Sequence, residues 1–280
     1  MESGTNTSIR FLPDANPDNV FFWVEKQMIT LDFPGVKGGD ENKTVTVQVP
    51  CVEMYDGPNT SPIQNELRPM WEDPTLEDTA RKYWKKKTYI FQGFVQNASF
   101  KEEEVPENPI RKFNVNGQLF KVIKAALLDP DSENTPTDYV NGTDFVITKT
   151  TQGKYADYTT SKYARRESAL SAEQLEAIEK YGLVDLATYL PERPTADHMT
   201  AMFEMFEASL AGELYDVERW GKFYRPYGVK SGPTDVSAAK PKPVVASTVT
   251  SSKYEAEASA EDDEVPFETN TVSTVTAHIS

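Results

Sequence analysis

The chain has 280 residues, of which 38% are hydrophobic and 26% charged, ordinary proportions for a globular protein with a buried core. Its single cysteine, Cys51, excludes an internal disulfide and a cysteine-based zinc cluster. There is no run of about 18 apolar residues, so no transmembrane helix is expected. The net charge of −15 argues against binding to nucleic acid, because an acidic surface repels phosphates.

That charge is unevenly distributed. Residues 81–166 hold fifteen Lys and Arg against ten Asp and Glu, a surplus of five positive charges, whereas residues 231–280 hold three Lys against eight Asp and Glu, a deficit of five. A basic middle with an acidic end predicts two different partners, or a tail that competes for a basic groove. A patchy solvated surface explains the same charges equally well.

The first part of the chain is predicted to contain several strands. Ile9–Pro13 and Val20–Val24 are apolar runs, and Thr44–Val49 alternates β-branched and polar residues, which is typical of a half-buried strand. Gly35–Asn42 is predicted to be a turn. Residues 51–80 are rich in Pro, Asn, Asp and Gly, which favours an irregular subdomain.

The next part is predicted to mix strands with helices. Arg111–Val115 ends at Asn116-Gly117, a dipeptide typical of a turn, and Gln118–Leu128 has apolar residues at helical spacing. The other predicted elements are a helix at Leu76–Trp84 and strands at Thr88–Gln96, Phe145–Thr151 and Ala156–Tyr163.

Helices are expected from residue 170 to about 225, packed back onto the strands. Ser171 and Gln174 form the pattern of a capping box. Thr195 precedes a stripe of large apolar residues, predicted to be core, at Met199, Met202, Phe203, Phe206 and Leu210. Residues 230–280 have almost no large apolar residues, so we expect a disordered acidic tail after a core of residues 1–229.

Two segments combine basic with aromatic residues. Basic side chains neutralise phosphates and aromatic rings stack on unpaired bases, so this combination favours a groove for single-stranded nucleic acid. A solvated edge strand with core aromatics is the plainer explanation. The candidate binding residues are Lys82, Tyr83, Trp84, Lys85, Lys86, Lys87, Tyr89 and Phe91 in the first segment, and Lys154, Tyr155, Tyr158, Lys162, Tyr163, Arg165 and Arg166 in the second.

In a strand, Lys85, Lys87, Tyr89 and Phe91 would share one face. For both segments to bind one nucleic-acid strand, they must meet across a single groove. The case for an enzyme is weak, because the two histidines form no metal-ligand pair and no phosphate loop or nucleophile motif is present. We therefore expect no catalysis.

The order and spacing of several segments resemble a known family. Ile9–Pro13, the lysine run before Thr88, Val105–Asn108 and Lys154–Tyr163 recur in this order in the single-stranded DNA-binding, helix-destabilising proteins of T-even-like bacteriophages. The resemblance covers roughly residues 8–225. It implies a five-stranded oligonucleotide-binding (OB) β-barrel in an α+β fold, a subdomain near residues 51–80, peripheral helices, and a function in phage DNA replication, recombination and repair in the host cytoplasm.

The resemblance also implies roles for individual residues. It assigns Arg10, Lys85, Lys86 and Lys87 to the phosphate backbone. It assigns Phe91, Tyr155 and Tyr158 to the base-stacking cleft, with Tyr83 and Trp84 nearby. The acidic tail would recruit replication and recombination proteins. Within it, a short stretch resembles the acidic tip of bacterial single-stranded DNA-binding proteins, where acidic residues precede a Pro-Phe pair, and a disordered acidic decoy that competes with DNA explains the same residues. The stretch comprises Asp262, Asp263, Glu264, Pro266 and Phe267.

The sequence departs from the family pattern at two places. The family binds zinc through one His and three Cys, but here only Cys51 remains, with Ser61 and Gln64 at two other positions and Lys26 or Gln27 at the last. We therefore expect no cofactor, because structural zinc normally needs four ligands. The family has a basic arm before the Ile9 strand, whereas the sequence as given starts almost at that strand, which fits a fragment, a misassigned start or a shorter variant. For the chain as given, self-association on DNA is expected to be weakened.

Three alternatives remain open from the sequence. The protein could be an RNA-binding regulator on the same fold. It could also be a virion structural or assembly protein, with its aromatics at subunit interfaces. A magnesium-dependent nuclease could use some of the many acidic residues.

Overall fold

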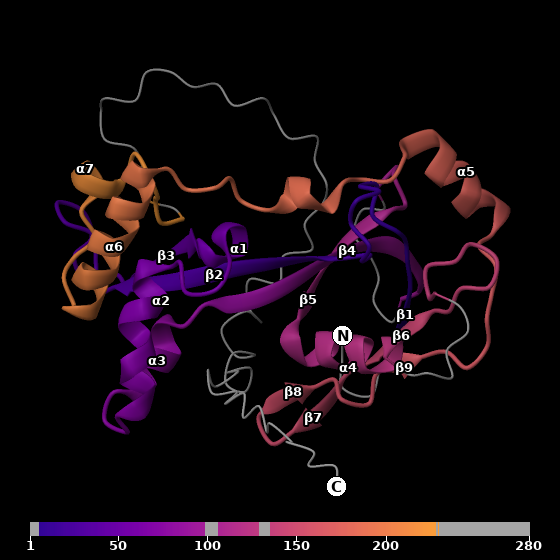
Figure 1. The fold of residues 1–280 in the computed structure, drawn as a ribbon, viewed down its shortest axis with the longest axis horizontal. Coiled ribbons are helices and arrows are strands. Elements are labelled where there is room, and N and C mark those ends of the chain that lie inside the picture. Colours follow the sequence, from indigo (N-terminus) through magenta and orange to yellow (C-terminus); the bar gives the residue numbers. More distant parts are fainter. Residues whose placement is uncertain (1–5, 99–105, 129–134, 228, 230–280) are drawn as a thin grey trace, which may run out of the picture.

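The computed structural model describes residues 6–98, 106–128, 135–227 and 229, and shows a mixed α+β fold (Figure 1). The strands are β1 (Asn6–Phe11), β2 (Val24–Phe33), β3 (Val45–Pro50), β4 (Lys86–Asn97), β5 (Arg111–Asn116), β6 (Phe145–Thr148), β7 (Thr150–Gln152), β8 (Tyr155–Asp157) and β9 (Lys162–Tyr163). The helices are α1 (Glu53–Asp56), α2 (Pro62–Leu67), α3 (Glu77–Tyr83), α4 (Gly117–Leu127), α5 (Ala172–Tyr181), α6 (Ala196–Leu210) and α7 (Val217–Trp220), with 3-10 turns η1 (Arg68–Glu72) and η2 (Leu186–Tyr189).

Strand β4 is the centre of the main sheet. Its first half pairs with β2, its second half pairs with β1, and β5 pairs with the middle of β4. The antiparallel order is β3-β2-β4-β1-β6-β9, with β5 attached to β4, and β7 pairs with β8 separately. The predicted α+β class with peripheral helices is confirmed. Among the described residues, these pairings do not close into a barrel.

Gly93 allows β4 to cross β1 closely. A Cβ atom at this position would lie 2.2 Å from the backbone oxygen of Arg10, well inside van der Waals contact. The residue pairs with both Phe11 in β1 and Arg111 in β5. Glycine is therefore needed here for close backbone approach rather than for an unusual φ angle.

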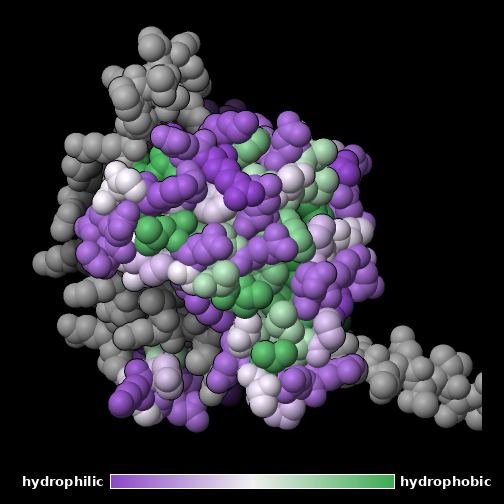
Figure 2. Space-filling model, turned by 90° about the vertical axis from the view of Figure 1, so that its left-hand side faces the viewer, coloured by the Kyte–Doolittle hydropathy of each residue, from purple (hydrophilic) through white to green (hydrophobic). Residues whose placement is uncertain are grey.

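Two main hydrophobic cores lie along this sheet. One joins β2 and β3 to α2, α3, α6 and α7, and the other joins β1, β4, β5 and β6 to α4. Strands β2 and β4 run from the end that carries α6 and α7 toward the middle of the molecule (Figure 1), with β2 contributing to the first core and β4 to the second. The end that carries α6 and α7 shows mainly hydrophilic residues around smaller hydrophobic patches (Figure 2). In the described ranges, every helix is too short or too polar to cross a lipid bilayer.

The predicted helix starts after residue 170 are confirmed. Ser171 and Gln174 make both hydrogen bonds of the capping box at the start of α5. Thr195 caps α6, whose residues Met202 and Phe206 are buried against the sheet. Leu210 is wrong as a core residue, because it lies on the exposed side at the end of α6.

Four other predictions need correction. Val20–Trp23 is a loop, and β2 begins only at Val24. Asn116 does not form a hairpin turn; its side chain accepts a hydrogen bond from the Leu119 amide and caps α4. Residues 51–80 hold short helices, and the last predicted strands are broken into the short strands β6 to β9.

Candidate nucleic-acid interface

A groove of about 1160 Å³ is lined by residues from the β1–β2 loop, from β4 and from several helices. One part of its lining comes from α1, η1 and the start of β4, and another part comes from α4. The loop Pro13–Trp23 and residues 135–137 contribute the remaining lining. The groove is larger than most small-molecule sites, which occupy about 300–1,000 Å³. We call it the groove below.

The lining of the groove is basic although the chain is acidic. It contains five cationic side chains and three carboxylates, a surplus of two positive charges, in a chain whose net charge is −15. A positive concave surface on an acidic protein concentrates an anionic ligand at one place. The cations are Arg68, Lys85, Lys87, Lys121 and Lys124, and the carboxylates are Asp14, Glu25 and Glu53.

Glu53 holds two of these cations in place. Its carboxylate is almost fully buried, and it accepts hydrogen bonds from Arg68, at 2.8 Å, and from Lys85. The backbone amide of Asn59 donates a further hydrogen bond to it. The Nζ atom of Lys87 lies 3.8 Å from Glu25. These pairs fix where the cations of this part of the lining stand.

Aromatic side chains line the same groove. Tyr89 on β4 and Phe120 on α4 stack in parallel with their ring centroids 3.4 Å apart. Trp23 contacts the edge of Phe120 at 5.3 Å, and Phe21 contacts Trp23 at 4.8 Å. Tyr89 and Phe120 are nearly buried, whereas Phe21 is 54% exposed. The rings therefore run from the floor of the groove out to solvent.

The first basic and aromatic segment contributes only part of its residues to the groove. Lys85, Lys87 and Tyr89 line it, as their alternation along a strand predicts. Phe91 lies beneath them in the core, where its ring contacts Trp23 at 5.8 Å. Lys82 and Lys86 are exposed elsewhere, and Lys82 lies 3.8 Å from Asp32.

Three predicted contact residues are buried, and we withdraw them. Arg10 has no exposed side-chain surface, and its Nε donates a 2.8 Å hydrogen bond to Asp144, so it cannot reach a phosphate. Tyr83 packs against Phe206 in the α6 core, and Phe91 is fully buried. A ring that is already packed on all sides has no face left for a base.

Trp84 occupies an intermediate position. It lines the groove but is only 7% exposed, because its ring packs edge-on against Trp71 and lies under the guanidinium of Arg68. Trp84 therefore supports the part of the groove lining that lies beside Arg68.

The second segment does not line the groove. Lys154 and Tyr155 are exposed on the β7–β8 hairpin, whereas Tyr158 and Tyr163 pack into the core that contains Tyr89. The hairpin is tied to α4 by a 2.9 Å hydrogen bond from Gln118 to Asp157. The expected meeting of the two segments thus occurs in the core rather than in the groove. Other exposed cations of this segment are Lys162, Arg165 and Arg166.

Three of the positions assigned to the family's zinc ligands, Cys51, Ser61 and Gln64, lie together and are buried. Cys51 is hydrogen-bonded to Ser61, and burial raises the pKa of its thiol. Gln64 accepts a hydrogen bond from the Lys85 amide and donates to the Tyr83 carbonyl. In the part of the chain that the structure describes, no group of three or more His, Cys, Asp or Glu could hold a metal ion.

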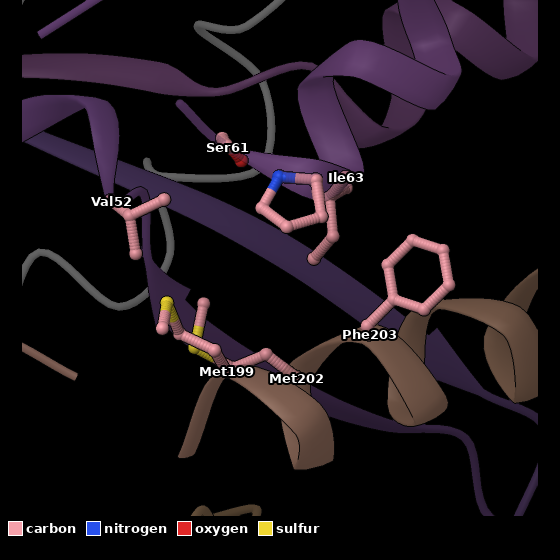
Figure 3. A pocket seen from close by; sticks show the side chains of 7 residues that line it. Val52, Ser61, Ile63, Met199, Met202 and Phe203 are labelled. Atoms are coloured by element: carbon pink, nitrogen blue, oxygen red, sulfur yellow. The ribbon is translucent and has the colours of Figure 1, made fainter. Parts of the chain in front are cut away.

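A second, much smaller pocket lies beside Ser61. It is bounded by Val52 and Ile63 on one side and by Met199, Met202 and Phe203 of α6 on the other (Figure 3). Its volume of about 10 Å³ is at most that of one water molecule. It is a packing defect between α2 and α6 rather than a ligand site.

Sequence reasoning missed the groove residues of two elements. The run Val20–Trp23 has the composition of a buried strand, so the sequence did not indicate that these residues form a loop. Lys121 and Lys124 lie three residues apart on the polar face of the predicted helix, and this spacing could have identified them. The predicted tail residues, Asp262 to Phe267, lie outside the described residues.

No family model matches the chain, and no match is found among curated protein sequences.

Proposed function

We propose that this protein binds single-stranded DNA in the groove, with little sequence preference and without catalysis. The observation that carries the proposal is that one concave surface combines five cations with a continuous set of aromatic rings. Cations neutralise backbone phosphates, and aromatic faces stack on bases of any sequence. The groove is therefore chemically matched to a flexible polyanion with exposed bases.

Binding of this kind destabilises duplexes by mass action. A ligand that binds only the unpaired strand shifts the melting equilibrium toward that strand. Each stacked base contributes about 1–3 kcal/mol, so a few stacked bases are enough for a measurable shift. The protein would hold unpaired strands during phage DNA replication, recombination and repair in the host cytoplasm.

The fold is compatible with this proposal at a finer level. We propose that β1, β2, β4, β5 and β6 are the strands of a partly open OB barrel, a fold that commonly binds oligonucleotides. Helix α4 follows β5 in the chain and packs against β4, β5 and β9. The clustering of Cys51, Ser61 and Gln64 also supports the T-even-like resemblance, because ligands of one lost metal site should lie together.

The direct test is a titration of labelled oligo-dT, followed by fluorescence anisotropy at several salt concentrations. We expect saturable binding whose log Kd changes with log salt by about 0.7 per phosphate neutralised. The double variant Lys121→Ala/Lys124→Ala should weaken binding and flatten the dependence. Saturable binding that ignores salt, or no binding at low salt, would contradict the proposal.

Two further arms of the experiment separate the alternatives. A matched RNA oligomer that binds more tightly than DNA would favour an RNA-binding regulator. Loss of the labelled strand after addition of magnesium would reveal a nuclease. A virion assembly protein should ignore both oligomers and form large oligomers alone, which sedimentation would detect.

A further inference from the structure

The loop between β1 and β2 presents apolar side chains to solvent. Val20 is 87% exposed and Phe21 is 54% exposed, and both line the groove. Exposed apolar surface is unfavourable in water by roughly 25 cal/mol per Å², although single exposed residues are common. Here the exposed residues are adjacent, and Phe22 and Trp23 follow directly. This local grouping distinguishes the loop from scattered surface residues.

Hydrogen bonds hold this loop in shape. Asp14 accepts bonds from the amide of Asn16, from the Asn19 side chain and from the distant Leu186 amide. Asn19 in turn donates to the Trp23 carbonyl and accepts from the Phe21 amide. The side chains of the loop are thus presented by an ordered backbone, and a ligand need not order the loop when it binds.

The exposed ring is the outer end of a set of ring contacts. Phe21 contacts Trp23, with centroids 4.8 Å apart, and Trp23 contacts Phe91 at 5.8 Å and Phe120 at 5.3 Å. Behind Phe120 stands Tyr89. The outer rings are therefore supported from below by the core, while one side of Phe21 stays open to solvent.

We propose that Phe21 and Trp23 form the platform on which an unpaired base of the bound strand stacks. This inference rests on the proposed function and names the side chains of the groove that contact the bases of its ligand. The occupant is a nucleic-acid base rather than an apolar peptide, because the lysines of α4 and β4 line the same groove and attract a polyanion. Flat rings beside cations match bases linked by phosphates.

The first test compares two aromatic residues that are equally exposed. Phe21 and Tyr155 each have 54% of their surface exposed, but only Phe21 lines the groove. Phe21→Ala should weaken oligo-dT binding about 5- to 150-fold, the range for loss of one stacked base, and Tyr155→Ala should leave it unchanged. Unchanged melting temperatures in both variants would show that the fold is intact.

An oligonucleotide with abasic sites separates stacking from a general disturbance of the groove. This probe keeps its phosphates but offers few bases. If Phe21 stacks on a base, the Phe21→Ala variant should lose affinity for oligo-dT but lose almost none for the abasic strand. An equal loss on both strands would overturn the proposal.

Tryptophan emission gives an independent measure. Stacking of a base on Trp23 should quench its emission, so Trp23→Phe should remove most of the quenching that oligo-dT causes. Trp71→Phe should retain the quenching, because Trp71 is not part of the groove lining. Undiminished quenching in Trp23→Phe would overturn the proposal.

The outcomes also distinguish this inference from the proposed function. If the unmodified protein fails to bind oligo-dT, the proposed function fails. If it binds, and Lys121→Ala/Lys124→Ala weakens binding while Phe21→Ala does not, only the platform fails. A change in the sedimentation of the free protein on Phe21→Ala would instead make the loop a contact between copies of the chain, which also overturns the platform.

Discussion

The groove and the segment of residues 150–166 share a composition but not a structure. Both bring lysines and aromatic rings together. In the groove the rings are graded from buried Tyr89 to exposed Phe21, and the cations stand beside them. In the 150–166 segment the exposed ring, Tyr155, lies at a hairpin, while Tyr163 is packed in the core.

This difference shows what a basic and aromatic composition leaves open. A tyrosine in a strand packs into the core or faces solvent according to which face of the sheet it occupies. A binding surface needs rings that are supported on one side and open on the other. The following predictions test whether the two regions differ in function as they do in structure.

The largest expected effect concerns Arg10, which the structure assigns to the fold. Asp144→Ala would leave the buried guanidinium of Arg10 without its ion-pair partner. Loss of one partner of a buried pair costs about 3–5 kcal/mol. Urea unfolding should show this loss of stability. At temperatures where the variant is folded, the salt dependence of its oligo-dT binding should be unchanged. A flattened salt dependence would indicate that Arg10 contributes to binding after all.

The second prediction compares two pairs of lysines. Lys121→Ala/Lys124→Ala should reduce the salt slope of oligo-dT binding by about 1.4, which is about 0.7 for each of two phosphates. Lys154→Ala/Lys162→Ala removes the same charge from the 150–166 segment and should change the slope little. If the second pair has the larger effect, the strand follows the hairpin rather than the groove.

Adjacent residues on β4 give a finer comparison. Lys87 lines the groove, whereas Lys86 is exposed outside the groove lining. Lys87→Ala should therefore reduce the salt slope by about 0.7, and Lys86→Ala should reduce it by less. Anisotropy titrations of both variants at matched salt concentrations would measure the difference. Equal slopes would mean that the groove does not bind the strand.

The smallest expected effect is a gain in stability at Tyr163. Its hydroxyl is buried, and the described residues provide no hydrogen-bond partner for it. Tyr163→Phe should therefore stabilise the fold by about 1 kcal/mol, seen as a higher denaturant midpoint. Oligo-dT affinity should stay the same. Lower stability or weaker binding would show that the hydroxyl has a role.

Tyr163 also predicts a pH dependence. Burial raises the pKa of its phenol, so the folded state favours the neutral form. The stability from this group is fully present below the unfolded pKa of about 10 and falls as pH rises above it. Tyr163→Phe should reduce the loss of stability above pH 10, measured by denaturant unfolding across that range.

Much of the fold could be predicted from local patterns. Alternation identified β3, and the capping residues Ser171 and Thr195 identified the starts of α5 and α6. These signals are local, so one sequence carries them. The strand ends at β6 to β9 could not be predicted, because short pairings depend on neighbours that are distant in the chain.

The groove could be predicted only in part. The alternation of Lys85, Lys87 and Tyr89 placed them on one face, and the structure places them in one groove. The burial of Arg10 could not be predicted, because its partner Asp144 is 134 residues away. The loop that carries Phe21 could not be distinguished from a strand, because an apolar run has the same composition in a buried strand and in an exposed loop held by Asp14 and Asn19.

If the groove binds a nucleic-acid strand as proposed, the carboxylate of Glu53 would influence how long that strand stays bound. Arg68 and Lys85 already share this internal anion, so an incoming phosphate competes with it. When the phosphate departs, both cations could pair with Glu53 again. In the proposed function, this internal competitor would weaken the hold of both cations on a bound strand and so favour its release.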